Sequence, residues 1–179
     1  QVPAWLVNGN FNRDQMIAIL QGHITQVMGR YRGRIVHWDV VNEAISDNNG
    51  QPRDSIWRQR IGADYIDIAF RAARAADPLA RLYYNDYEAE GSGAKSDAVF
   101  NLVSGLVSRG VPIDGVGWQW HKISGSNATV TSAHANNAAR IANLGLELMI
   151  TEADVRIQLP TTAAKLQQQA AEYRSLWNF

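Results

Sequence analysis

Residues 34–43 read RIVHWDVVNE, an apolar run that closes with the carboxylate of Glu43. A second run, LELMITE at residues 146–152, closes in the same way with Glu152. Such runs are typical of buried strands in parallel sheets, which keep their chemistry at the carboxyl ends of the strands. The interval between the two glutamates leaves room for three strand–helix units of about 36 residues each. The sequence therefore predicts two acids on one rim of a parallel sheet.

Strand-like and helical runs alternate along the rest of the chain. Four strands are expected, at residues 35–41, 81–85, 113–119 and 146–152. A first helix is expected to start at Asn12, with Gln15 completing the start signal. The other helices are expected at residues 56–76, 94–109 and 131–144, and from Thr161 or Thr162 towards the end of the chain. This alternation predicts an α/β fold, and the glycines of the third strand suggest close packing there.

Four parallel strands are too few to close a (β/α)8 barrel, which takes eight strands and typically about 250 residues. An open sheet would leave two unpaired edges, which soluble proteins normally avoid or cover. We therefore expect the chain to be a piece of a larger barrel. Because the sequence opens on Gln1 rather than methionine, we also expect its start to be processed, trimmed or incomplete.

The composition excludes several classes of function. The chain has 179 residues, and 17 Lys plus Arg balance 17 Asp plus Glu, so no net field favours nucleic acid or an acidic membrane surface. No apolar stretch is long enough to span a bilayer. Cysteine is absent, which excludes disulfides and thiolate zinc sites. His23, His37 and His134 lack ligand-like spacing, so no metal is expected.

The two glutamates have the chemistry that glycosidic bond cleavage requires, a proton donor and a nucleophile. Burial beside Trp38 would raise the pKa of Glu43 and suit it to general acid catalysis. His121 follows the third strand, and a hydrogen bond from it would keep Glu152 ionised. Taken alone, a glutamate at a strand end is more often a solvated loop residue, and a lone histidine is more often part of a core. The shared position of all three at strand ends favours the catalytic interpretation.

Other polar and aromatic residues fall at the same ends. Asn42 could bind a substrate hydroxyl, and Asp154 faces the same side as Glu152, although it could also be a cap. Tyr87 could give its hydroxyl to the nucleophile, stack near a sugar or pack inside the protein. Trp118 and Trp120 flank Gln119 and are either sugar-stacking platforms at the rim or core residues.

Four motifs taken together resemble one family: WDVVNE at 38–43, LYYNDY at 82–87, GVGWQWH at 115–121 and ITEAD at 150–154. Their order and spacing resemble the glycoside hydrolase family 10 endo-β-1,4-xylanases over essentially the whole chain. The resemblance implies a TIM (β/α)8 barrel, of which residues 1–179 would supply the middle portion. This portion would be strands four to seven, without the first three strands and the eighth.

The resemblance also implies roles for individual residues. Glu43 would be the acid/base and Glu152 the nucleophile of a retaining, double-displacement mechanism. Asn42 would bind a sugar hydroxyl, and the remaining positions would support the active site: Tyr87, Gln119, His121 and Asp154. The family implies xylan as the substrate, no cofactor, and a secreted, extracellular monomer. Trp118 and Trp120 stand where the family usually has smaller or less aromatic residues, which could narrow the cleft.

Three other interpretations stay open at this point. A related barrel hydrolase could cleave cellulose or another β-glucan. A carbohydrate-binding barrel could lack turnover altogether, although it would not need an acid and a nucleophile. The chain by itself could be inert, exposing apolar sheet edges and aggregating. Separately, Asn127-Ala128-Thr129 fits the N-glycosylation sequon, which matters only if the protein is secreted.

Overall fold

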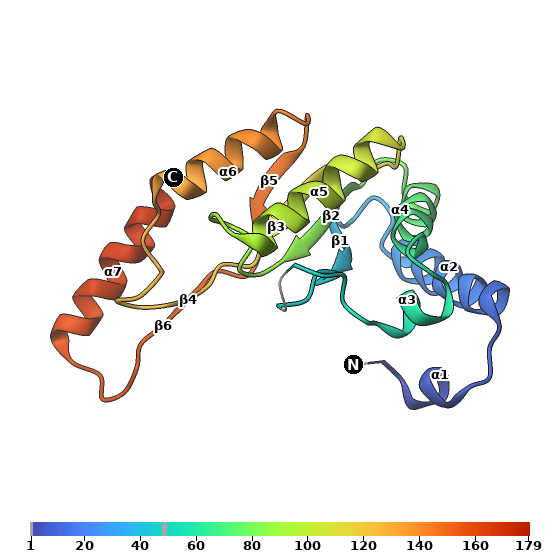
Figure 1. The fold of residues 1–179 in the computed structure, drawn as a ribbon, viewed down its shortest axis with the longest axis horizontal. Helices are drawn as coiled ribbons and strands as arrows, with labels where there is room; N and C mark the ends of the chain where they lie inside the picture. The colour runs from blue at the N-terminus through green and yellow to red at the C-terminus, as the bar shows by residue number, and fades with distance from the viewer. Residues whose placement is uncertain (1, 48–49) are drawn as a thin grey trace.

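Four parallel strands form the main sheet and lie side by side in the order in which they occur in the sequence (Figure 1). The computed structural model describes residues 2–47 and 50–179. The strands of the main sheet are β1 (His37–Asn42), β2 (Arg81–Asp86), β3 (Gly115–Trp118) and β5 (Glu147–Ile150). Because this order never reverses, it is the order of a (β/α) barrel and not that of a doubly wound sheet. The predicted α/β fold with four parallel strands is confirmed.

A second, two-stranded parallel sheet continues the main one and was not predicted. It pairs β4 (His121–Ile123) with β6 (Asp154–Arg156). β4 follows β3 after Gln119 and Trp120, and β6 follows β5 after residues 151–153. The backbone of Trp120 has a φ of 61°, a left-handed conformation that interrupts the run of extended residues.

Helices occupy the segments between the strands. They are α1 (Ala4–Asn8), α2 (Arg13–Arg30), α3 (Ile56–Arg60), α4 (Tyr65–Ala76), α5 (Ala94–Ser108), α6 (Ser132–Ala142) and α7 (Ala163–Trp177). The start signal at Asn12 is confirmed, because Asn12 and Gln15 exchange side-chain and backbone hydrogen bonds of 2.9 and 3.0 Å. Thr162 caps α7 by accepting a bond from the backbone of Lys165.

The prediction of one helix over residues 56–76 is wrong, because α3 and α4 are separate. Gly62 lies between them with a φ of 111°, a conformation that glycine adopts without strain and that ends the helix at that point. The short helix α1 was not predicted either.

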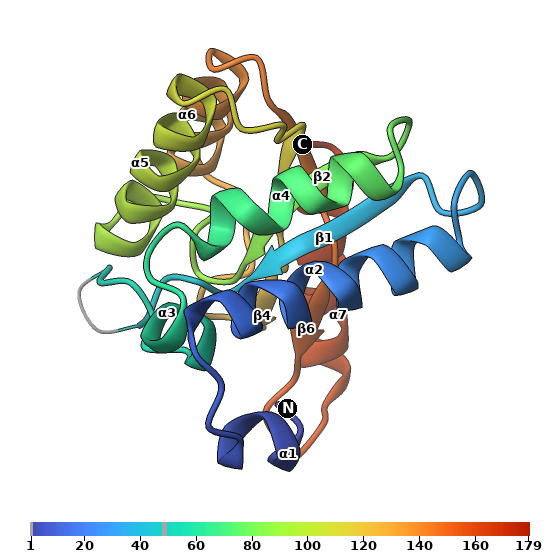
Figure 2. The same cartoon turned by 90° about the vertical axis from the view of Figure 1, so that its right-hand side faces the viewer.

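Packing of helices on the sheet forms the core. α2 packs on α4, and α4 packs on β1, as Figure 2 shows from the side of these two helices. Several large side chains of this core have no exposed surface: Met16, Phe70, Leu82, Tyr84, Val103, Leu106 and Val116. Each such side chain stabilises the fold by about 1.5–3 kcal/mol relative to its exposed state. Within the described residues, β1 and β5 pair on one side only, so they are the edges of the main sheet.

None of the helices in residues 2–47 and 50–179 has both the length and the apolar content that a bilayer crossing requires.

Candidate active site

A cavity of about 470 Å³ opens at the carboxyl ends of the main-sheet strands. It is lined by Glu43, Tyr87, Glu88, Gln119, His121, Glu152, Asp154 and Arg156. Six of the seven residues predicted for the site therefore share one cavity, and the seventh, Asn42, is hydrogen-bonded to Glu43. The predicted meeting of acids from distant parts of the chain at one rim is confirmed.

Glu43 follows directly on β1 and has a φ of 54°, which turns the chain at the strand end. Its Oε1 atom accepts hydrogen bonds from the Asn42 side chain at 3.2 Å and the Gln119 side chain at 3.1 Å. Its Oε2 atom lies 3.8 Å from the guanidinium of Arg53. The side chain is 34% exposed, so the predicted burial beside Trp38 is not found in this chain.

Glu152 follows β5, and both of its carboxylate oxygens take part in hydrogen bonds. Oε1 accepts a bond of 2.8 Å from the Asn85 side chain, and Oε2 lies 3.1 Å from Nε2 of His121. The other imidazole nitrogen of His121 lies 2.9 Å from Asp154. The predicted contact between His121 and Glu152 is confirmed, and Asp154 fixes the ring from the opposite side.

The environment of His121 favours the protonated imidazole. Burial lowers its pKa, but the hydrogen bonds to the Asp154 and Glu152 carboxylates outweigh this effect and raise the pKa above the usual value of 6.5. A protonated ring donates through both nitrogens, as its two carboxylate neighbours require. Both oxygens of Glu152 then act as acceptors, which is the arrangement of an ionised carboxylate.

Asn85 connects the surroundings of the two glutamates and was not predicted. Its Nδ2 atom donates to Glu152 at 2.8 Å and to the Asn42 side chain at 3.1 Å, while its Oδ1 atom accepts a bond of 2.7 Å from Thr151. Asn85 is 1% exposed and lies near the carboxyl end of β2, directly before the buried Asp86. Gly117 makes room for it, because a Cβ atom there would collide with the Asn85 side chain. The expected close packing at the glycines is thereby confirmed.

Tyr87 lines the cavity, but its hydroxyl forms hydrogen bonds on the side away from Glu152. It donates to Asp47 at 2.6 Å and accepts a bond of 3.4 Å from Arg53, which places it beside Glu43. Lys95 lies over the Tyr87 ring at 3.4 Å and binds Asp47 at 2.8 Å. Hydrogen bonds from Lys95 and Tyr87 lower the pKa of Asp47. Of the three alternatives for Tyr87, the hydroxyl contact to Glu152 is not found, because Asp47 and Arg53 bind the hydroxyl instead.

Trp118 and Trp120 are core residues, so their predicted alternative role as sugar platforms is wrong. Both have no exposed surface, and Trp118 stacks on Phe179 with ring centroids 6.4 Å apart. Trp120 packs against His134 at 5.0 Å. Because both rings point away from the cavity, neither narrows the cleft.

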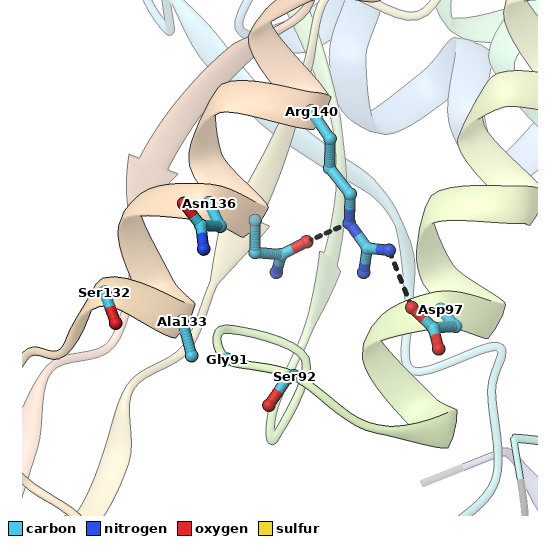
Figure 3. A pocket seen from close by; sticks show the side chains of 8 residues that line it. Gly91, Ser92, Asp97, Ser132, Ala133, Asn136 and Arg140 are labelled. Carbon is cyan, nitrogen blue, oxygen red and sulfur yellow. Dashed lines mark hydrogen bonds and ion pairs between the residues drawn. The ribbon is translucent and has the colours of Figure 1, made fainter.

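A second hollow, of about 360 Å³, lies between the starts of α5 and α6. Figure 3 shows Arg140 of α6 reaching Asp97 of α5 across it, at 2.6 Å. The three guanidinium nitrogens of Arg140 all donate to neighbouring side chains, at 2.6 Å each. This hollow holds a structural tie and no arrangement of reactive groups, so the cavity with the two glutamates is the candidate active site. Among the described residues, no cluster of His, Cys, Asp and Glu is arranged to hold a metal ion.

Comparison with known proteins identifies the family and the fold. The family model described as glycosyl hydrolase family 10 matches residues 1–179. An endo-1,4-beta-xylanase of Agaricus bisporus is 44% identical over 176 residues, which are 98% of this chain and 52% of the relative. Endo-1,4-beta-xylanase A of Fusarium oxysporum f. sp. lycopersici is 43% identical over 179 residues, 97% of this chain and 54% of the relative.

Solved structures are similar over nearly the whole chain. Xylanase 10B of Thermotoga petrophila, crystallised in complex with xylobiose, has a TM-score of 0.93 and 40% identity, and the match covers 99% of this chain and 54% of that one. Native xylanase 10B of Thermotoga maritima has a TM-score of 0.93 and 39% identity with the same coverage. The chain thus spans about half the length of the relatives it matches. On the family match and these identities, the chain belongs to glycosyl hydrolase family 10, and its α/β fold is that of a TIM barrel.

Proposed function

We propose that the protein is a retaining endo-1,4-β-xylanase that hydrolyses internal β-1,4-xylosidic bonds of xylan. One observation carries the proposal: Glu43 and Glu152, from the two edge strands of the sheet, line the same cavity and are linked through Asn85 and Asn42. The names of the relatives, and the xylobiose in the complex of one of them, support xylan as the substrate.

In the proposed mechanism, Glu152 attacks the anomeric carbon while protonated Glu43 gives its proton to the departing glycosidic oxygen. A covalent glycosyl–enzyme forms and the leaving chain departs with a free hydroxyl. Glu43, now a carboxylate, takes a proton from water as that water attacks the anomeric carbon and releases Glu152. Two displacements retain the anomeric configuration.

The contacts of the two glutamates differ in kind. Glu152 has both oxygens engaged by Asn85 and His121, which holds it as an oriented anion. Glu43 has amide donors on one oxygen and the Arg53 cation near the other, at 3.8 Å. This cation stabilises the carboxylate that is left after Glu43 has given up its proton.

Two alanine variants test the division of roles. Glu43→Ala should lose most activity on xylan but keep the first step on an aryl xylobioside whose leaving group departs without protonation. Azide should then intercept the glycosyl–enzyme of this variant and release a β-xylobiosyl azide. Glu152→Ala should lose turnover on both substrates, and azide should give the α-product. Equal losses of Glu43→Ala on both substrates would contradict the assignment.

Comparison of substrates tests the specificity. Release of reducing sugar from xylan should greatly exceed release from carboxymethylcellulose. Faster cleavage of the cellulose derivative would indicate a glucan hydrolase. Saturable binding of xylan with no release of reducing sugar would indicate a binding protein.

We further propose that β1, β2, β3 and β5 correspond to strands four to seven of an eight-stranded barrel, and that the protein is a secreted monomer. The unreversed strand order and the match to about half of each solved relative support the correspondence. Detection of xylanase activity in the culture supernatant of the source organism tests secretion, and light scattering after size-exclusion chromatography tests the oligomeric state.

A further inference from the structure

Trp120 lies between the two residues that hold the catalytic glutamates. Gln119, on one side of it, donates to Glu43, and His121, on the other side, contacts Glu152. The Trp120 backbone has a φ of 61°, which bulky residues rarely adopt, and its side chain has no exposed surface. The backbone conformation of Trp120 therefore sets the directions in which the side chains of Gln119 and His121 point.

A buried pair of opposite charges holds Trp120 in this conformation. Glu90 Oε1 accepts a hydrogen bond of 3.1 Å from the backbone N–H of Trp120, and Glu90 Oε2 accepts one of 2.8 Å from Lys122. The Lys122 ammonium also lies 5.0 Å from the centroid of the Trp120 ring. Glu90 is 1% exposed and Lys122 is 5% exposed. The pair thus binds Trp120 at its backbone and at its ring.

The loop that carries Glu90 is fixed from α6. The Asn137 side chain donates to the carbonyls of Ala89 and Glu90 at 2.7 and 2.9 Å. Arg140 donates to Asn137 at 2.6 Å and continues to Asp97 of α5 (Figure 3). Because the loop is held in this way, the Glu90 carboxylate has a fixed position, and its hydrogen bond fixes the backbone N–H of Trp120.

The charges of the pair are not needed to fill the core, since two apolar side chains of similar size usually fill such a space as well or better. What Glu90 supplies, and an apolar residue does not, is an acceptor for the buried N–H of Trp120. Lys122 balances the charge of that acceptor. Glu88 and His134 are the other titratable groups that line the same hollow as the pair. Burial and then the charge of Lys122 lower the pKa of His134, so it adds no second cation near neutral pH.

We propose that Glu90 and Lys122 are positioning residues that set the backbone at Trp120, so that Gln119 and His121 reach Glu43 and Glu152. The inference rests on the proposed function, because it gives the pair a role in that reaction. Neither residue touches the cavity that holds the glutamates. Displacement of reacting groups by about 1 Å can cost about 100-fold in rate, so even a small change at Trp120 should be measurable.

Two uncharged double variants separate positioning from charge balance. Glu90→Gln with Lys122→Met keeps a carbonyl oxygen for the Trp120 N–H, whereas Glu90→Met with Lys122→Met removes it. The first variant should keep kcat on xylan within about 3-fold of the wild type. The second should lower kcat by about 10- to 100-fold with little change in KM.

The titration of His121, followed by NMR, is the second measurement. The acids that face its ring are Glu152 and Asp154, and Arg156, Glu43 and Glu88 line the same cavity. If the ring moves away from its two partners, its raised pKa should fall towards the ordinary value in the variant with Glu90→Met, but not in the one with Glu90→Gln. A residue that only stabilises the fold would shift the melting temperature and leave this titration unchanged.

Wild-type kcat and wild-type titration of His121 in the variant with Glu90→Met would overturn the proposal. If that variant does not fold, Asn137→Ala provides the test, because it frees the loop that carries Glu90. The pKa of His121 should then shift in the same direction by a smaller amount. A wild-type titration of His121 in Asn137→Ala would overturn the proposal. The titration needs no turnover. If the wild type does not cleave xylan, the proposed function fails while the positioning of His121 is still decided.

Discussion

The two ends of the main sheet use charged residues in opposite ways. At the amino end, Asp114 pairs with Arg74 at 2.5 Å and with Arg81 at 3.3 Å, and Arg81 also contacts Glu147. The hydroxyl of Tyr83 donates to Glu147 at 2.5 Å. Both Asp114 and Glu147 therefore have a cation as their partner, which ties the strands together at this end.

At the carboxyl end, acids outnumber cations. The basic groups that line the cavity are Arg156 and His121. Its lining also includes four carboxylate side chains, those of Glu43, Glu88, Glu152 and Asp154. The two proposed catalytic glutamates are oriented largely by amides, from Asn42, Asn85 and Gln119. Amides orient a carboxylate without neutralising it, so the acids stay available to a substrate. The comparison indicates that the amino end serves stability and the carboxyl end serves chemistry.

The largest expected effect contrasts two glutamates at opposite ends of one strand. Glu152→Gln should lower kcat on xylan by about 10⁴-fold or more, because it removes the proposed nucleophile. Glu147→Gln should leave kcat near the wild-type value and lower the free energy of unfolding by about 0–1 kcal/mol, because its ion pair is exposed. Steady-state kinetics and thermal unfolding of both variants provide the test. A loss of turnover in Glu147→Gln as large as that in Glu152→Gln would abolish the distinction between the ends.

A smaller effect is expected when Asn85 is changed. Asn85→Ala removes the amide that orients Glu152 and leaves the Thr151 hydroxyl without its acceptor, so kcat should fall by about 100-fold, on the scale of losing one preorganised donor. Asp114→Asn is the control at the amino end. It should lower stability by about 1–3 kcal/mol with kcat preserved, because the paired arginines lose their anion. If the Asn85 variant kept full kcat, its linking role would be refuted.

Two glycines of β3 allow the same comparison within one strand. A Cβ atom at Gly117 would collide with Asn85, and one at Gly115 would collide with the ring of Tyr83. Gly117→Ala should therefore lower kcat by about 10-fold through displacement of Asn85, whereas Gly115→Ala should mainly cost about 1–3 kcal/mol of stability through overpacking. The ratio of lost kcat to lost stability, measured for both variants, should differ clearly between them. Equal ratios would mean that the two glycines of β3 do not differ in their effects on activity and stability.

The sequence was sufficient to predict the four main strands and the pair of acids, because an apolar run that ends in a carboxylate indicates a buried strand and the residue at its end. Glu43 and Glu152 could be placed on one rim from the strand order alone. Apart from the contact between His121 and Glu152, contacts between side chains from different strands were beyond it. Asn85 lies in the polar pair that ends β2, a position that does not tell which residues of neighbouring strands it binds, and Arg53 lies in a polar loop without a motif.

Orientation of aromatic side chains was also unpredictable. A ring at a strand end faces the core or the cavity according to the backbone, and the left-handed turn at Trp120 cannot be read from residue types. The position of the Tyr87 hydroxyl depends on its hydrogen-bond partners Asp47 and Arg53, which come from another loop. The prediction of one continuous helix across Gly62 failed for a different reason. A single glycine inside a helical pattern is often tolerated, so its presence did not indicate a break.

The smallest expected effect is a contrast in how stability depends on pH. The pKa of His121 is raised in the folded state, so its protonated ring contributes stability that is present below the usual value of 6.5 and lost as the pH rises through the raised pKa. Its partners Glu152 and Asp154 must be ionised for this to hold. The pKa of Glu147 is lowered, first by the hydrogen bond from Arg81, so its contribution is present above the usual value of 4.5 and lost as the pH falls through the lowered pKa.

Melting temperatures of the wild type, His121→Gln and Glu147→Gln across pH 3 to 9 would resolve the two contributions. The difference between wild type and His121→Gln should be largest in mildly acidic solution and shrink towards alkaline pH. The difference between wild type and Glu147→Gln should stay constant at neutral and alkaline pH and shrink in acid. Because both side chains are substantially exposed, each difference should be a few degrees at most and should decrease with added salt. Parallel curves for the two variants would show that the ends of the sheet do not differ in their electrostatics, and the assignment of stability to one end and chemistry to the other would then rest on kinetics alone.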